Sequence, residues 1–124
     1  MALYELRGMR GRFAQQLADA EDVLIDVTLL ARGWVMEDKR LAAQFAGTVH
    51  RLSARSLDAR LDAELSVLTN VKLRLRDPRI DQESGDIYGK VIEKTTEPSG
   101  QVVRVRITSV DAADQKMIET LLNT

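Results

Sequence analysis

The sequence predicts an α+β domain that is mainly β: a small six-stranded antiparallel β-barrel with an N-terminal amphipathic helix and a C-terminal helix. Apolar and polar residues alternate over six short segments, which is typical of strands that are buried on one face. In the first and last segments apolar residues instead recur at steps of three and four, which is typical of amphipathic helices. Six short strands at close spacing favour a barrel over a fold of alternating strands and helices. The 124 residues suffice for one such domain with its own core.

The first element, residues 1–22, is predicted to be an amphipathic helix ahead of a barrel domain of residues 23–124. The pattern is too short for a coiled coil on its own, so its apolar stripe has to pack against something. Two arrangements stay open: the helix covers the barrel as a lid, or it associates with a protein partner or a second copy of the chain. The candidate interface residues of the stripe are Leu6, Met9, Phe13 and Leu17.

The first two strands are predicted from a change of period to two. Residues 23–29 alternate, and Arg32–Gly33 is predicted to end the first strand. A second strand is predicted over residues 41–51, after a solvated turn at residues 37–39. Its predicted inward face consists of Leu41, Ala43, Phe45, Gly47 and Val49, in which the glycine indicates a bulge or a close backbone approach.

The middle of the chain predicts two more strands and a loop. Residues 51–56 make a tight connection to a third strand over residues 57–61. After a turn, residues 71–76 alternate as a half-buried strand should. Residues 77–86 lose the pattern and are predicted to be a loop. The polar face of the third strand is predicted to hold Asp58, Arg60 and Asp62.

The last strands, over residues 87–93 and 102–107, are predicted to form a hairpin across a turn at residues 97–100. The C-terminal helix is predicted to begin after Asp111, because an aspartate is a favourable N-cap. Its apolar stripe is Met117, Ile118, Leu121 and Leu122.

The composition excludes several classes of function. The formal net charge is −1, so the chain lacks the basic field with which a general nucleic-acid binder displaces counterions. It contains no cysteine, which excludes disulfides, thiolate zinc sites and cysteine nucleophiles. No segment approaches the ~20 apolar residues that cross a bilayer, and no signal peptide is recognisable. We expect a cytoplasmic protein that neither binds nucleic acid nor inserts into a membrane.

Catalytic and metal-binding patterns are incomplete. His50 is the only histidine, and only hydroxyls such as that of Ser53 lie near it in the sequence, which does not make a catalytic triad. Asp81, Glu83 and Asp86 match only fragments of a calcium-binding loop. We therefore expect a binding protein that is not an enzyme and that uses no cofactor and no metal.

Four segments occur in an order that is known from one family. They are FAGTVHRLSARSLDARL, TNVKLRL, GDIYGKVIEK and PSGQVVRVRITSVDAADQKMIETLL, and together they run from Phe45 to Leu122. This stretch resembles a PilZ domain, the bacterial barrel that senses cyclic di-GMP. The most specific part is the ending, a strand that runs into an acidic-capped helix. The resemblance implies a PilZ-like barrel and a role in bacterial motility, surface attachment, pilus biogenesis or exopolysaccharide control.

The two nucleotide-binding motifs of that family are incomplete here. The family carries Arg-x-x-x-Arg ahead of the barrel, whereas the arginines at positions 7, 10 and 12 are spaced by three and two. The second motif, Asp/Asn-x-Ser-x-x-Gly, falls on residues 51–56 and keeps only Ser53. Arg51 has no acceptor for the guanine edge, and Ser56 replaces the glycine that would give a ligand clearance. The resemblance therefore implies the fold and speaks against the usual ligand.

The segment of residues 51–56 has two interpretations. Arg51 and Arg55 could form a relocated anion or nucleotide site, because guanidinium groups grip phosphate and stack on guanine. Alternatively the segment is a solvated turn whose charges pair with Asp58 and Asp62 and contribute only ~0–1 kcal/mol. The candidate ligand-binding residues are Arg51, Ser53, Arg55 and Ser56.

Trp34 belongs to an apolar cluster at the predicted end of the first strand. It either caps the barrel or anchors a protein interface, since tryptophan is enriched at binding hot spots. Two functions follow as hypotheses. The first is a PilZ-like adaptor that acts through contacts with a protein partner or as a homo-oligomer; the second is a sensor of cyclic di-GMP or another nucleotide with a non-standard arginine site.

Overall fold

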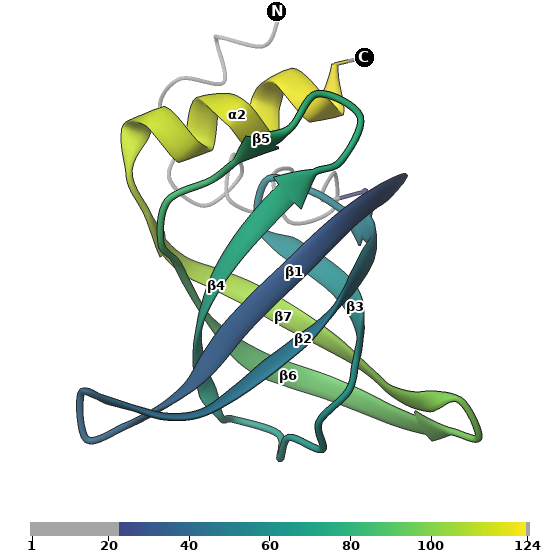
Figure 1. Ribbon diagram of the computed structural model, residues 1–124, viewed down its shortest axis with the longest axis vertical. Helices are drawn as coiled ribbons and strands as arrows, with labels where there is room; N and C mark the ends of the chain where they lie inside the picture. Colours follow the sequence, from purple (N-terminus) through teal and green to yellow (C-terminus); the bar gives the residue numbers. More distant parts are fainter. Residues whose placement is uncertain (1–22, 124) are drawn as a thin grey trace, which may run out of the picture.

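Seven strands and a closing helix make up residues 23–123, the part of the chain that the computed structural model describes. The helix, α2 (Ala112–Leu122), lies across one end of the strands (Figure 1). The strands are β1 (Ile25–Glu37), β2 (Arg40–Leu52), β3 (Ser56–Leu61), β4 (Asn70–Asp77), β5 (Gln82–Glu83), β6 (Ile87–Glu97) and β7 (Gly100–Val110).

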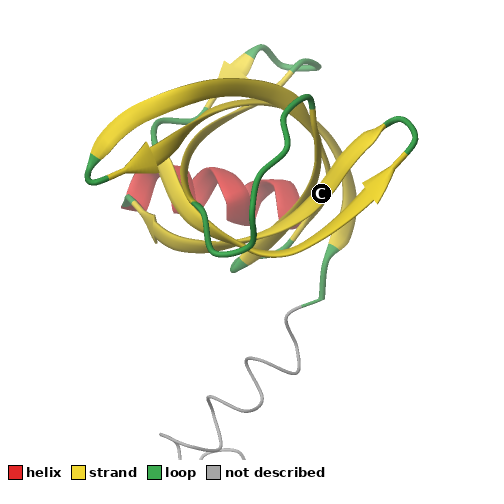
Figure 2. Ribbon diagram, turned by 90° about the horizontal axis from the view of Figure 1, so that it is seen from below, coloured by secondary structure: helices red, strands yellow, loops and turns green. Residues whose placement is uncertain are grey.

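The strands form one antiparallel sheet in the order β1-β2-β3-β7-β6-β4-β5. Because β1 also pairs with β4, the pairings of six strands make a complete circuit, and only the two-residue β5 lies outside it. Figure 2 shows these strands as a ring seen along its axis. The predicted class, mainly β and antiparallel with a C-terminal helix, is confirmed, and the sheet has one strand more than predicted. That strand forms inside the predicted loop, where β5 pairs with the end of β4.

The core lies inside the ring and is closed at one end by α2. Inward side chains such as Leu29, Val49 and Ile87 are fully buried, and each contributes roughly 1.5–3 kcal/mol relative to an exposed position. Ile118 and Leu121 join this core from the helix. The predicted N-cap is confirmed, since the Asp111 carboxylate accepts a hydrogen bond from the backbone N–H three residues on, at 2.9 Å.

The prediction that Arg32–Gly33 ends the first strand is wrong. β1 continues to Glu37, and Gly33 is buried in the middle of it. A Cβ at this position would lie 2.7 Å from both Leu73 Cδ2 and Phe45 Cζ. The glycine therefore marks a place where two core side chains converge on the strand, and the alternation continues through it.

The predicted turn at residues 37–39 is confirmed, and it closes a hairpin that projects beyond the ring (Figure 1). Asp38 and Lys39 both have positive φ, 49° and 66°, as a tight two-residue hairpin turn requires. Leu41 and Ala43 were predicted to face the core but are exposed. They lie on the projecting arm, where the ring has no interior for them to fill.

The predicted N-terminal helix and its candidate interface residues lie outside residues 23–123. Within those residues, no helix has the length and apolar character that a crossing of the bilayer requires.

Candidate functional site

The turn between β2 and β3 is held together by the two serines of the predicted ligand motif. Ser53 Oγ accepts hydrogen bonds from the backbone N–H groups of Arg55 (3.2 Å) and Ser56 (3.0 Å). The same hydroxyl donates to the Ser56 carbonyl at 3.3 Å, and both serines are buried. A hydroxyl that closes its own turn has a structural role.

Serine also fits the backbone at position 56. The described residues with positive φ are Asp38, Lys39, Leu68, Asp81 and Gly100, and Ser56 is not among them. The left-handed freedom that glycine provides is therefore not needed at this turn. The departure from the family's motif at this position leaves the fold unstrained.

Asp58 is the centre of an ion-pair cluster on the outside of the ring. It points outward from β3, yet its side chain is only 5% exposed. Arg104 of β7 binds both carboxylate oxygens, with Nε–Oδ1 at 2.8 Å and Nη2–Oδ2 at 3.1 Å. Arg51 of β2 adds an Nε–Oδ2 contact of 3.3 Å. The sheet register explains the cluster, because Asp58 lies opposite Arg51 on one side and opposite Arg104 on the other. We call this outer surface of β2, β3 and β7 the Asp58 face.

The predicted site residues are only partly brought together. The expected pairing of Arg51 with Asp58 is present. Asp62, expected to pair with a nearby arginine, accepts a hydrogen bond from the Ala46 N–H at 2.9 Å. Sequence reasoning missed Arg104, which lies 46 positions beyond Asp58. The signal that could have found it is the alternation of arginines at positions 104 and 106 along β7.

Trp34 stands inside β1, not at a strand end, and three cations surround its ring. Lys72 Nζ lies 4.9 Å from the ring centroid, and the guanidinium carbons of Arg74 and Arg32 lie 5.6 and 5.9 Å from it. Each such contact contributes about 0.5–1 kcal/mol at an exposed site. In the register, Trp34 lies opposite Lys72, and Lys72 lies opposite Tyr88. We call the outer surface formed by Arg32, Trp34, Lys72, Arg74 and Tyr88 the Trp34 face.

Two carboxylates partly balance these cations. Asp86 accepts a hydrogen bond from Arg74 Nε at 2.8 Å and lies 3.7 Å from Lys72 Nζ. The Arg74 hydrogen bond is the main cause that holds the pKa of Asp86 below its usual range, against the opposing effect of burial. Glu83 contacts Arg32 at 3.2 Å. Glu83 and Asp86, which matched only fragments of a calcium-binding loop in the sequence, therefore face cationic side chains.

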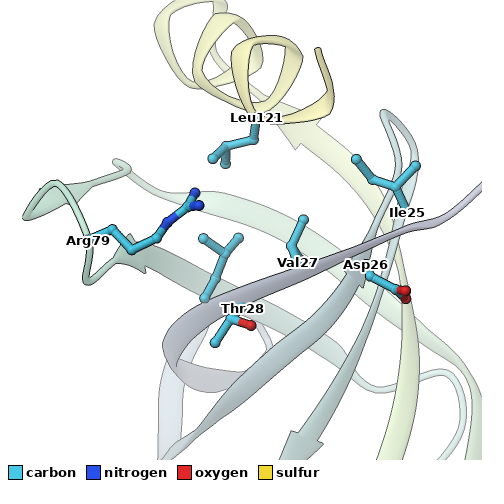
Figure 3. A pocket seen from close by; sticks show the side chains of 7 residues that line it. Ile25, Asp26, Val27, Thr28, Arg79 and Leu121 are labelled. Atoms are coloured by element: carbon cyan, nitrogen blue, oxygen red, sulfur yellow. The ribbon is translucent and has the colours of Figure 1, made fainter. Parts of the chain in front are cut away.

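Two hollows in the surface are lined by residues other than the predicted site residues. A pocket of about 440 Å³ lies between the start of β1, Arg79 and Leu121 of α2 (Figure 3). Its ionisable lining groups are Asp26 and Arg79, and the Arg79 guanidinium binds Asp77 at 2.9 Å. A groove of about 280 Å³ adjoins the Trp34 face and is lined by Leu30, Ala31, Arg32, Arg74, Arg76 and Glu83. Within residues 23–123, no group of three or more His, Cys, Asp or Glu side chains could hold a metal ion.

Comparison with known proteins identifies the fold. No family model matches the chain, and no curated protein matches it in sequence. The structure of the inhibitor of motility MotI/DgrA from Bacillus subtilis is similar, with a TM-score of 0.63 and 15% identity over 84% of this chain and 52% of that chain. The PilZ domain of CeSA from a cellulose-synthesizing bacterium has a TM-score of 0.54 and 17% identity over 80% of this chain and 97% of that domain.

These two similarities confirm the resemblance that the sequence indicated: the chain has a PilZ-like fold. It spans about half the length of the MotI/DgrA chain and nearly all of the CeSA domain. Similarity at this level of identity defines the architecture, whereas function depends on the residues of the site.

Proposed function

We propose that this chain is a PilZ-like regulatory barrel that acts through contacts with a protein partner and does not take cyclic di-GMP by the family's two motifs. The observation that carries the proposal is the pairing of Arg51 with Asp58. Position 51 is where the motif needs an acceptor for the guanine edge, and a guanidinium offers donors only. The neighbouring Ser53 hydroxyl already bonds to its own turn.

The two similar structures support a regulatory role of this kind. One is named an inhibitor of motility, and the other is a PilZ domain from a cellulose-synthesizing bacterium. A non-enzymatic, cytoplasmic regulator of bacterial motility or of the cell surface is consistent with both. Its interface would draw on Trp34 and on the N-terminal stripe, Leu6, Met9, Phe13 and Leu17, all of which stay predictions.

Calorimetric titration of the full chain with cyclic di-GMP tests the proposal. We expect no measurable heat at ligand concentrations well above those that saturate a micromolar site. Micromolar binding that disappears in Arg51→Ala would contradict the proposal. Arg60→Ala is the matched control, because Arg60 is an outward arginine that is paired with Glu97 at 3.0 Å and lies outside the motif.

A second candidate function, a nucleotide sensor with a non-standard site, rests on the arginines of the Asp58 face. Arg51 and Arg104 converge on Asp58, and Arg106 lies opposite Ser56 in the register. The Arg55 carbonyl accepts a hydrogen bond from the Ile107 N–H at 2.7 Å, which brings the turn against the same strand. The same titration decides between the two functions, since the sensor requires binding that depends on Arg51 or Arg55.

A further inference from the structure

We infer that the Trp34 face is a docking surface for an acidic segment of a partner protein. This inference rests on the proposed function and adds the chemistry of the partner and the place where it binds. It concerns the outer surface of β1, β4 and β6, whereas the family's ligand motif lies on the connection between β2 and β3.

The first observation is the position of the aromatic residues. Residues 23–123 contain three of them, of which Phe45 is buried in the core at 3% exposure. The other two, Trp34 and Tyr88, both lie on the outside of the ring and flank Lys72 in one row of the register. Tyr88 is 38% exposed and Trp34 is partly exposed, so this surface carries aromatic area that the core does not bury. Tryptophan, tyrosine and arginine are also the residue types that dominate binding energy at protein interfaces.

The balance of charge is the second observation. Three cations lie within 6 Å of the indole, namely Arg32, Lys72 and Arg74, against two carboxylates, Glu83 and Asp86. Lys72 and Arg74 share the single carboxylate of Asp86. The surface around the ring therefore carries one positive charge in excess of its carboxylates, which favours an anionic partner.

The hydrogen-bonding groups of this surface point to the same chemistry. The hydrogen bond from Arg74 to Asp86 uses Nε, so its two terminal nitrogens make no hydrogen bond to a residue that the structure describes. The indole N–H of Trp34 likewise has no hydrogen-bond partner within residues 23–123. Guanidinium, ammonium and indole groups are all donors. A segment that brings carboxylate oxygens would offer these donors charged acceptors in place of solvent.

The adjoining groove indicates that the partner segment also carries an apolar side chain. It holds about 280 Å³ between arginine side chains, with Leu30 and Ala31 in its lining. Leu30 is 42% exposed although its neighbour Leu29 is buried. A segment with an apolar side chain between carboxylates would place the apolar group against Leu30 and the carboxylates against Arg32 and Arg74.

The single tryptophan of the chain makes the inference directly testable, because its fluorescence reports on this surface alone. The probe is a short synthetic peptide of Glu and Leu, and its counterpart has Lys in place of Glu. We expect the Glu peptide to change the Trp34 emission in a saturable, salt-sensitive way and the Lys peptide to leave it unchanged. Arg32→Gln and Arg74→Gln should each weaken binding about tenfold. Arg60→Gln, an outward arginine of similar exposure on β3, should bind like the parent protein.

Several results would overturn the inference. Emission that is unchanged by the Glu peptide, an equal response to the Lys peptide, or equal affinity in Arg32→Gln and Arg74→Gln would each do so, provided that thermal melting shows the variants folded. A dimer by light scattering that dissociates in Trp34→Ala would also overturn it, since the surface would then bind a second copy. Binding of cyclic di-GMP that depends on Arg51 would overturn the proposed function, whatever the result with the peptide. If neither cyclic di-GMP nor the Glu peptide binds, only the present inference is overturned.

Discussion

The Asp58 face and the Trp34 face are built from the same residue types, arginines beside an aspartate, yet they differ in how far the carboxylate is covered. The Asp58 side chain is 5% exposed and binds two guanidinium groups. The Asp86 side chain is 36% exposed and contacts one arginine and one lysine. On the Asp58 face the arginines cover the carboxylate, whereas on the Trp34 face the cations lie against an aromatic ring. Removing one partner of a covered ion pair leaves the other charge without compensation, whereas a half-exposed pair contributes little and can exchange its partner for a ligand.

The largest expected effect comes from removing the covered carboxylate. Asp58→Ala should lower the free energy of unfolding by about 2 kcal/mol, because the charge-assisted hydrogen bonds to Arg104 and the ion pair with Arg51 are lost. The effect stays below that of a fully buried pair, since both arginines can reach water once they are released. Urea denaturation of Asp58→Ala and the parent protein measures the difference. A loss as small as that of an ordinary surface substitution would remove the distinction between the two faces.

A smaller effect is expected when the exposed carboxylate is removed. Asp86→Ala should lower the free energy of unfolding by less than about 1 kcal/mol, because water screens a half-exposed ion pair and solvates the cations that remain. The same denaturation series measures it. Should Asp86→Ala destabilise the protein as much as Asp58→Ala does, the Trp34 face would be structural too, and its availability to a partner would be in doubt.

The smallest expected effect is a change in titration. Arg74 holds the pKa of Asp86 below its usual range, so the unfolded chain binds this proton more readily than the folded chain does. The pair therefore contributes stability above the ordinary carboxyl pKa of about 4, and that contribution is lost as the pH falls through the lowered value. Arg74→Gln should move the pKa of Asp86 upward in an NMR titration of its side-chain carboxyl carbon.

The matched control for this titration is Arg79→Gln. The Arg79 hydrogen bonds lower the pKa of Asp77 in the same way, so this variant should shift Asp77 and leave Asp86 unchanged. A pKa of Asp86 that does not respond to Arg74→Gln would show that Arg74 is not the group that holds it.

Much of the fold could be predicted because its cues are local. Alternation over residues 71–76, the N-cap at Asp111 and the hairpin turn at residues 97–100 each depend on neighbours within a few positions, and the structure has all three. The predictions that were wrong concern positions where a local sequence pattern is caused by residues of distant strands or by a very short strand. Gly33 indicated a strand end, but it is a glycine because Leu73 and Phe45 crowd it from other strands. Residues 77–86 lost their pattern because β5 has only two residues to show one.

The sequence by itself determined the mainly β class, the C-terminal helix and the departure of Arg51 and Ser56 from a nucleotide-binding motif, because period, caps and side-chain chemistry are properties of the chain alone. Only the tertiary structure decided what the outward side chains meet. Register between distant strands placed Arg104 on Asp58 and placed Lys72 and Arg74 around Trp34. Those partners come from segments far apart in the chain, and hydrogen bonding between strands, which carries no local signature, brings them within contact distance.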